Sequence, residues 1–235
     1  MRILQALKQD LKYQFRHGFY YAYIFVSLIY IAIIFFVPSD YRALVAGIIV
    51  FSDPAMLGFF FIGAIVLLEK GENIFEGLFV TPLKVNEFLA ARVLSLCILA
   101  LFTAFIIGII AIGFNFNYLL LFAALFLTSI IFTLLGVTLA VRVKTVNEFL
   151  IYSIFYSVII AVPILEFVNI YENIIFYIWP TRASLLLILG SFTRNTELLE
   201  ILFSIFVLIL WTIIAYKWAY TCFYTYIILK IGDQE

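Results

Sequence analysis

The stretch "EKGENIFEGLFVTPLKVNEF", residues 69–88, lies between two of the most apolar parts of the chain. It holds six of the 28 charged residues, although the whole sequence is 66% hydrophobic and only 12% charged. Its apolar positions 74, 75, 78 and 79 recur at helical spacing against polar positions on the other side. This pattern predicts a short amphipathic helix, which ends at Thr81-Pro82 because the residue before a proline is pushed out of helical geometry.

The apolar sequence on either side sets the class of protein. With 27 Phe and a mean hydropathy of +1.20, the chain has too little polar surface to cover a water-soluble globule. Apolar runs long enough to cross a bilayer, which takes roughly 20 residues as a helix, recur along its length. We therefore predict an all-α integral membrane protein with six transmembrane helices, at about 19–37, 44–68, 88–112, 118–140, 149–165 and 198–217.

Three further segments complete the predicted organisation. Residues 1–18 form a charged, amphipathic N-terminal helix, and residues 218–235 form a C-terminal tail beyond the membrane domain 19–217. Between spans five and six, the apolar segment 174–192 is interrupted by Pro180 and Arg182. We expect a broken or re-entrant element there, shielded from lipid by neighbouring helices.

Basic residues predict the orientation. Eleven of the fourteen Lys and Arg residues fall in the N-terminal arm, the 69–87 loop with Arg92, the 141–148 loop and the C-terminal tail together with Lys217 at its border. By the positive-inside rule, we expect both termini and the 69–87 segment to be cytoplasmic in a cell (plasma) membrane. The pentapeptide VNEFL occurs at 85–89 and again at 146–150, each time where a span begins. We interpret it as two similar helix starts, with Asn86 and Asn147 as N-caps, rather than as an internal duplication.

Several kinds of chemistry have no motif in this sequence. The chain contains no phosphate-binding G-x-x-x-x-G-K-[ST] loop, no G-x-G-x-x-G, no H-E-x-x-H and no G-x-S-x-G. Cys97, Cys222 and a single His do not make a disulfide or metal pattern, so we predict neither. With a net charge of +0 and no basic patch, nucleic acid is not an expected partner. We expect a protein that is not an enzyme and has no cofactor of its own.

Three stretches carry a resemblance to a known family: "RHGFY" at 16–20, "SDPAMLGFFFIGAIVLLEK" at 52–70 and "EGLFVTPLKVNEFLAAR" at 76–92. There the sequence resembles the permease subunits of ABC exporters of the second exporter class, and most closely the bacterial drug and fluoroquinolone export permeases. The resemblance implies a multi-pass bacterial exporter subunit. Its partners would be a second permease chain, identical or related, and two ABC ATP-binding subunits, which bind the ATP and Mg.

The resemblance also implies roles for particular segments. The N-terminal arm would be a connecting helix, and 69–87 a coupling helix that docks on the ATP-binding subunit. The segment 166–197 would hold an external gate. The residues so implicated are Glu69, Lys70, Gly71, Glu72, Glu76, Thr81 and Pro82 in the coupling element, Lys8, Lys12 and Arg16 on the connecting helix, and Glu166, Glu172, Pro180 and Arg182 near the gate. From periodicity alone, an ordinary amphipathic helix resting on lipid headgroups fits 69–87 equally well.

Asp53 stands near the middle of the second span, where an ionised side chain is costly. It could face a water-filled path or a cationic substrate. Alternatively, Asp53 could be an N-cap with Pro54 as the first residue of a half-helix. Both interpretations stay open at this stage.

We predict the membrane subunit of an ATP-driven exporter that moves a hydrophobic or amphipathic substrate outward by alternating access. One alternative is a membrane scaffold or immunity-type protein that transports nothing and recruits a soluble partner through 69–87. Another is an ion-coupled carrier that works alone, with Asp53 and Glu166 as proton or cation sites. The sequence does not identify the substrate.

Overall fold

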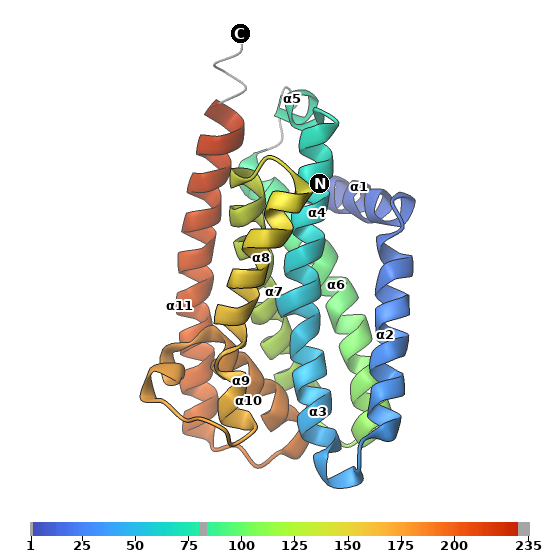
Figure 1. The fold of residues 1–235 in the computed structure, drawn as a ribbon, viewed down its shortest axis with the longest axis vertical. Coiled ribbons are helices and arrows are strands. Elements are labelled where there is room, and N and C mark those ends of the chain that lie inside the picture. Colours follow the sequence, from blue (N-terminus) through green and yellow to red (C-terminus); the bar gives the residue numbers. More distant parts are fainter. Residues whose placement is uncertain (1, 80–83, 230–235) are drawn as a thin grey trace.

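The computed structural model describes residues 2–79 and 84–229, and these residues fold as a bundle of helices (Figure 1). The helices at the start of the chain are α1 (Arg2–Arg16), α2 (Phe19–Phe36), α3 (Ser39–Ser52), α4 (Gly58–Gly71), α5 (Ile74–Phe79) and α6 (Val85–Ile112). The later ones are α7 (Tyr118–Arg142), α8 (Val146–Ala161), α9 (Ile164–Phe167), α10 (Pro180–Thr193) and α11 (Leu198–Phe223). The π-helical turns Asp53–Leu57 and Tyr224–Ile228 and the 3-10 helix Ile174–Ile178 complete the set.

Five helical segments of the described residues are long and apolar enough to cross a membrane. They are Phe19–Phe36, Ser39–Gly71, Val85–Ile112, Tyr118–Arg142 and Leu198–Ile228. The predicted fifth span, 149–165, corresponds to α8, which has 16 residues and ends before Pro163. The structure therefore shows an all-helical protein with multiple apolar spans, while the six-span arrangement stays a prediction.

The last helix is longer than the sequence predicts. Residues 218–229 of the predicted tail are helical and continue α11 through the turn Tyr224–Ile228. The predicted span ended at Lys217, the only charged residue between Glu200 and Lys230. A single lysine does not stop a helix, because lysine is a good helix former and its stem packs along apolar surface.

α7 is the centre of the bundle and packs against α4, α6, α10 and α11. Its contact with α4 depends on Gly136, because a Cβ at this position would lie 2.8 Å from the backbone oxygen of Phe59. The outer helices are much more exposed: only 11% of the residues of α2 are buried, against 67% of the most apolar window of α7.

α1, the C-terminal end of α11 and α5 lie at the same end of the bundle (Figure 1). The chain turns from α1 into α2 at Gly18, whose φ of 79° favours glycine. α3, α9 and α10 lie towards the opposite end.

The two VNEFL segments do begin helices, but asparagine is not the N-cap of either. The caps are Lys84 for α6 and Thr145 for α8, and Asn86 and Asn147 fall inside the first turn. In both helices the glutamate folds back onto the chain before it: Glu87 accepts from the Lys84 N–H at 3.0 Å, and Glu148 from the Lys144 N–H at 2.9 Å. The glutamate therefore matters more to the shared helix start than the asparagine does.

We expect Gly136→Ala to lower the free energy of unfolding by about 1–3 kcal/mol, because the added methyl group forces α7 away from α4. Gly77→Ala on α5 is the matched control, since a Cβ there meets nothing within 4 Å. Thermal unfolding of the purified variants in detergent provides the measurement. An unchanged midpoint for Gly136→Ala would contradict the close approach of these helices.

Candidate functional site

The predicted coupling element divides into two parts in the structure. α4 continues through Glu69 and Lys70 to Gly71, so these residues belong to the end of a spanning helix and not to a separate loop helix. The chain then turns at Asn73, which has a φ of 53°, and α5 begins at Ile74. Thr81 and Pro82 lie outside the described residues.

A buried ion cluster lies at this end of the bundle, centred on Arg92 of α6. Its guanidinium group donates a hydrogen bond to Glu69 of α4 and lies 3.0 Å from Asp10 of α1, counted between Nη1 and Oδ1. All three residues are at least 92% buried. Arg92 also lies over the ring of Phe88, with 4.8 Å between its Cζ and the ring centroid. One arginine therefore ties together three helices that are distant in the sequence.

α1 has one face for this cluster and another for solvent. Asp10 and Gln14 are buried against α6, where the Gln14 amide donates to the Ser95 hydroxyl at 2.9 Å. The basic residues Lys8, Lys12 and Arg16 are exposed, four residues apart along the helix. The predicted connecting helix is thus packed against the spans by the face that carries Asp10 and Gln14, while its basic face remains accessible.

Burial raises the pKa of the Asp10 carboxyl group from 3.8 to about 6. The attraction of Arg92 opposes this shift, and the neighbouring charge of Glu69 adds to it. Two carboxylates share one guanidinium group, so the cluster carries one excess negative charge when every member is ionised. Protonation of Asp10 removes that excess.

Lys70 forms a second connection at the end of α4. Its ammonium group donates to the carbonyl oxygens of Val141 and Val143, at 3.1 and 2.7 Å. These carbonyl groups lie at the C-terminal end of α7, where the helix dipole favours a cation. Lys70 therefore fastens the end of α4 to the central helix.

α5 is anchored by aromatic packing. The ring of Phe75 lies 5.9 Å from that of Phe88 on α6 and 5.6 Å from that of Phe223 on α11. Ile74 lines a cavity of about 140 Å³ beside the ion cluster. Movement of α5 would thus displace the side chains of α6 and α11 that Phe75 contacts.

Gly71, Glu72 and Glu76 are the exposed members of the predicted coupling element. Glu72 lies 3.9 Å from His17, measured between Oε1 and Nε2. Glu69 and Lys70, in contrast, form their contacts inside the chain. The surface that a soluble partner could touch is therefore acidic. Glu72 follows directly on the last turn of α4, which carries Glu69 of the buried cluster.

Asp53 is not the N-cap of a half-helix, so this interpretation is wrong. Its backbone is helical, with φ −58° and ψ −63°, and its carboxylate accepts from the Thr103 hydroxyl of α6 rather than from a backbone N–H. Pro54 lacks the N–H that an α-helix needs at this point. The π-helical turn Asp53–Leu57 takes up the change of register, and the helix continues from α3 into α4.

At the opposite end, the predicted gate segment is divided before Pro180, the first residue of α10. Arg182 in the first turn donates through Nε to both carboxylate oxygens of Glu166, at 2.8 and 2.9 Å. Its guanidinium group also lies 3.6 Å from the ring centroid of Tyr177. Glu172 is exposed and takes no part in this ion pair.

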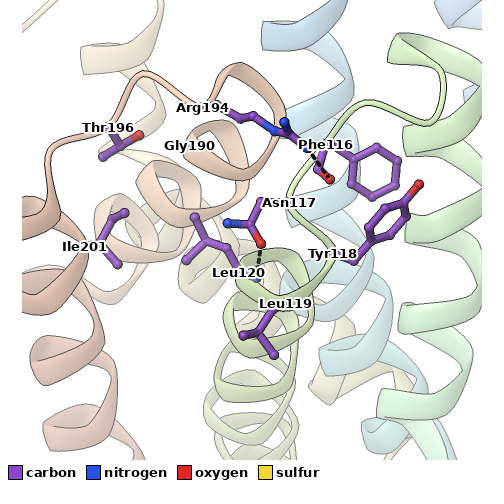
Figure 2. A pocket seen from close by; sticks show the side chains of 9 residues that line it. All are labelled: Phe116, Asn117, Tyr118, Leu119, Leu120, Gly190, Arg194, Thr196 and Ile201. Carbon is purple, nitrogen blue, oxygen red and sulfur yellow. Dashed lines mark hydrogen bonds between the residues drawn. The ribbon is translucent and has the colours of Figure 1, made fainter.

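A pocket of about 530 Å³ lies at the same end, between the start of α7 and the start of α11 (Figure 2). Asn117 caps α7 by accepting from the Leu120 N–H at 3.1 Å, and Arg194 donates to the Phe116 carbonyl group at 3.2 Å. No motif in the sequence indicates this pocket.

Asp10, Gln14 and Ser95 are site residues that were not predicted from the sequence, and Arg92 was predicted only as a charge that orients the chain. A signal was present, because Asp10 and Gln14 fall on the apolar side of an otherwise amphipathic helix. An acidic residue on that side needs a buried cationic partner. Among the described residues, no group of His, Cys, Asp and Glu could hold a metal ion.

These features define a helical protein with several apolar spans, of the multi-pass membrane class, with a buried polar cluster beneath an exposed acidic turn. The model of the fluoroquinolones export permease protein family matches residues 1–231, and the chain belongs to this family. It is therefore a membrane export permease, and the resemblance to drug-export-type permeases is confirmed.

Two relatives from different strains of Mycobacterium tuberculosis are both named fluoroquinolones export permease protein. Each is 29% identical to this chain over 194 residues, which is 82% of this chain and 82% of the relative. No solved structure matches the chain.

We expect Arg92→Gln to lower the free energy of unfolding by about 3–5 kcal/mol, because Glu69 and Asp10 would then be buried without a cation. Adding Asp10→Asn and Glu69→Gln to this variant should restore much of the loss, since no unpaired charge remains. Arg16→Gln on the exposed face of α1 is the control. Equal stability of the Arg92 and Arg16 variants in thermal unfolding would show that the cluster is not buried.

The raised pKa of Asp10 predicts a particular pH dependence. The folded protein holds this proton more tightly than the unfolded chain, so stability should fall as pH rises from about 4 to about 6 and level off above that. Asp10→Asn should lack this component. Unfolding midpoints of the two proteins, compared across this pH range, test it; a parallel pH dependence would contradict the assignment.

Proposed function

We propose that this chain is the membrane subunit of an ATP-driven ABC exporter, with ATP and Mg bound by a separate ATP-binding subunit. Two such subunits would serve a dimer of permease chains, either two copies of this chain or this chain with a related one. The observation that carries the proposal is the exposed acidic turn with Glu72 and Glu76, which is joined by buried contacts to the spanning helices.

These contacts support a mechanical role for the turn. Arg92 links the end of α4 to α1 and α6, Lys70 links it to α7, and Phe75 links α5 to α11. A soluble subunit that moves α5 would therefore act on several helices at once. A helix that merely rested on lipid headgroups would need none of these buried polar links, which each cost desolvation energy.

The surfaces at this end favour a soluble protein partner on the cytoplasmic side. α1, which carries the basic face, and the acidic turn after α4 lie at the same end of the bundle as the C-terminal end of α11 (Figure 1). The distribution of Lys and Arg along the sequence supports a cytoplasmic position for this end. The opposite end, with the Glu166–Arg182 pair and α10, would then face outward and act as the external gate.

The names of the two relatives suggest the substrate. We propose that this chain exports fluoroquinolones or similar amphipathic aromatic molecules, by alternating access from the inner to the outer side. The aromatic content of 19% provides apolar surface for such molecules.

The first experiment is co-purification in detergent of the tagged chain expressed with its neighbouring genes. Glu72→Gln/Glu76→Gln should weaken binding of the ATP-binding subunit about tenfold, because these are the exposed acidic groups of the turn. The matched control, Glu197→Gln/Glu200→Gln, removes two exposed acids from the opposite end and should bind normally. Glu69→Gln should keep the subunit bound but reduce substrate-stimulated ATP turnover, since Glu69 is buried.

Failure of folded wild type to retain any ATP-binding subunit would contradict this proposal. Transport by the chain alone in proteoliposomes with an ion gradient would then identify an ion-coupled carrier. Absence of transport with and without ATP would identify a scaffold or immunity-type protein.

A further inference from the structure

Asp53 is a buried carboxylate whose hydrogen bonding is incomplete. It is fully buried, with an exposed fraction of 0%. One oxygen accepts from Thr103, and the other has no partner among the described residues. No basic side chain in the described part of the chain forms an ion pair with it; the arginines in ion pairs are Arg92 and Arg182. An ionised carboxylate at this depth would be stabilised by any cation that reached it.

A groove of about 460 Å³ lies between α2 and α6, and Thr103 forms part of its wall. Its lining is almost entirely apolar, apart from the hydroxyl groups of Thr103, Ser27 and two tyrosines. Leu28 and Phe102, at its edge, are 59% and 67% exposed. Since α2 is the least buried of the candidate spans, the groove opens toward the side of the bundle that lipid would cover.

The side chain of Thr103 lies between the groove and Asp53. Its hydroxyl group lies 3.0 Å from the Ala100 carbonyl oxygen and 3.2 Å from that of Leu99, in addition to its contact with Asp53. It could therefore release Asp53 and donate to its own helix instead. This exchange would free the carboxylate without leaving a buried hydroxyl group unsatisfied.

The backbone beside Asp53 is also unusual. The π-helical turn Asp53–Leu57 interrupts the regular hydrogen bonding between α3 and α4. Such turns inside long helices occur frequently at functional sites. Three features therefore lie next to one another. They are the Asp53 carboxylate in the turn, the Thr103 hydroxyl group that can change partner, and the apolar groove between α2 and α6.

We propose that the groove between α2 and α6 binds an amphipathic cation, such as a protonated amine. Its apolar body would lie along Ile24, Leu28 and Phe102, and its charge would pair with Asp53. The inference rests on the proposed function in one respect only, namely that the bound cation is the exported substrate or belongs to its chemical class. Binding itself requires no ATP-binding subunit. Entry from the lipid phase suits a molecule that first partitions into the bilayer.

The test is equilibrium binding to the purified chain in nanodiscs of a neutral phospholipid, with tritiated tetraphenylphosphonium as the probe. Unlabelled adamantylamine and adamantanol serve as competitors, because they share an apolar body and differ in charge. We expect saturable binding that adamantylamine displaces at about tenfold lower concentration than adamantanol, as a charge-assisted contact predicts.

Three variants locate the site. Asp53→Asn should bind the probe about tenfold more weakly, since it can still accept from Thr103 but has no charge. Asp40→Asn makes the same change at an exposed position of α3 and should bind as wild type does. Ser27→Phe should abolish binding by filling the groove from α2 without touching Asp53. Thermal unfolding of each variant shows that it is folded.

Wild-type affinity in Asp53→Asn, equal competition by adamantanol or absence of saturable binding to wild type would each overturn the inference. The groove would then be an apolar crevice for lipid chains. Because the assay uses the chain alone, loss of cation binding and loss of an ATP-binding partner are separate results. Saturable cation binding, together with failure to retain an ATP-binding subunit in the co-purification, would support the site and contradict only the ATP-driven mechanism.

Discussion

The end of the molecule that carries α5 depends on one buried guanidinium group. Arg92 reaches carboxylates on α1 and α4 from α6, so three helices are held by side chains that are costly to bury separately. This arrangement favours one geometry over others, because each displaced carboxylate would be left in an apolar environment without its cation. Hydrophobic packing alone would allow the same helices to slide. The ion cluster therefore makes this end of a very apolar bundle stiff and specific.

Stiffness is distributed unevenly over the rest of the structure. α7 is enclosed by its neighbours and approaches α4 closely at Gly136. α2 is attached mainly through one side and has an open groove along α6. A transport protein that changes shape needs both tightly and loosely packed helices, because a rigid group of helices must move relative to helices that are held less firmly. The described contacts assign the rigid part to α4 and α7 and the loosely packed part to α2.

The sequence was informative where the physics is local. Composition and the length of apolar runs predict spanning helices, and the spacing of residues 74–79 predicts α5. The sequence was less informative where partners come from distant helices. Nothing near Arg92 reveals that Asp10, 82 positions earlier, supplies its counter-charge. Asp53-Pro54 was also misleading, because the pair is a common helix start; here the bundle holds the helix continuous and a π-helical turn accommodates the proline.

The continuous helix from Ser39 to Gly71 has a mechanical consequence. Its 33 residues span about 50 Å at a rise of roughly 1.5 Å per residue, well beyond the roughly 30 Å of a hydrocarbon core. A bend at this turn would move α4 relative to α3 as one unit with α7, to which Gly136 and Lys70 hold it, and would carry α5 at the tip of α4. Over the roughly 22 Å from Leu57 to Glu72, a bend of about 10° would displace the tip by about 4 Å. A small local change in the backbone beside Asp53 would thus be coupled to a displacement of α5. A soluble subunit bound to α5 could produce this displacement or respond to it.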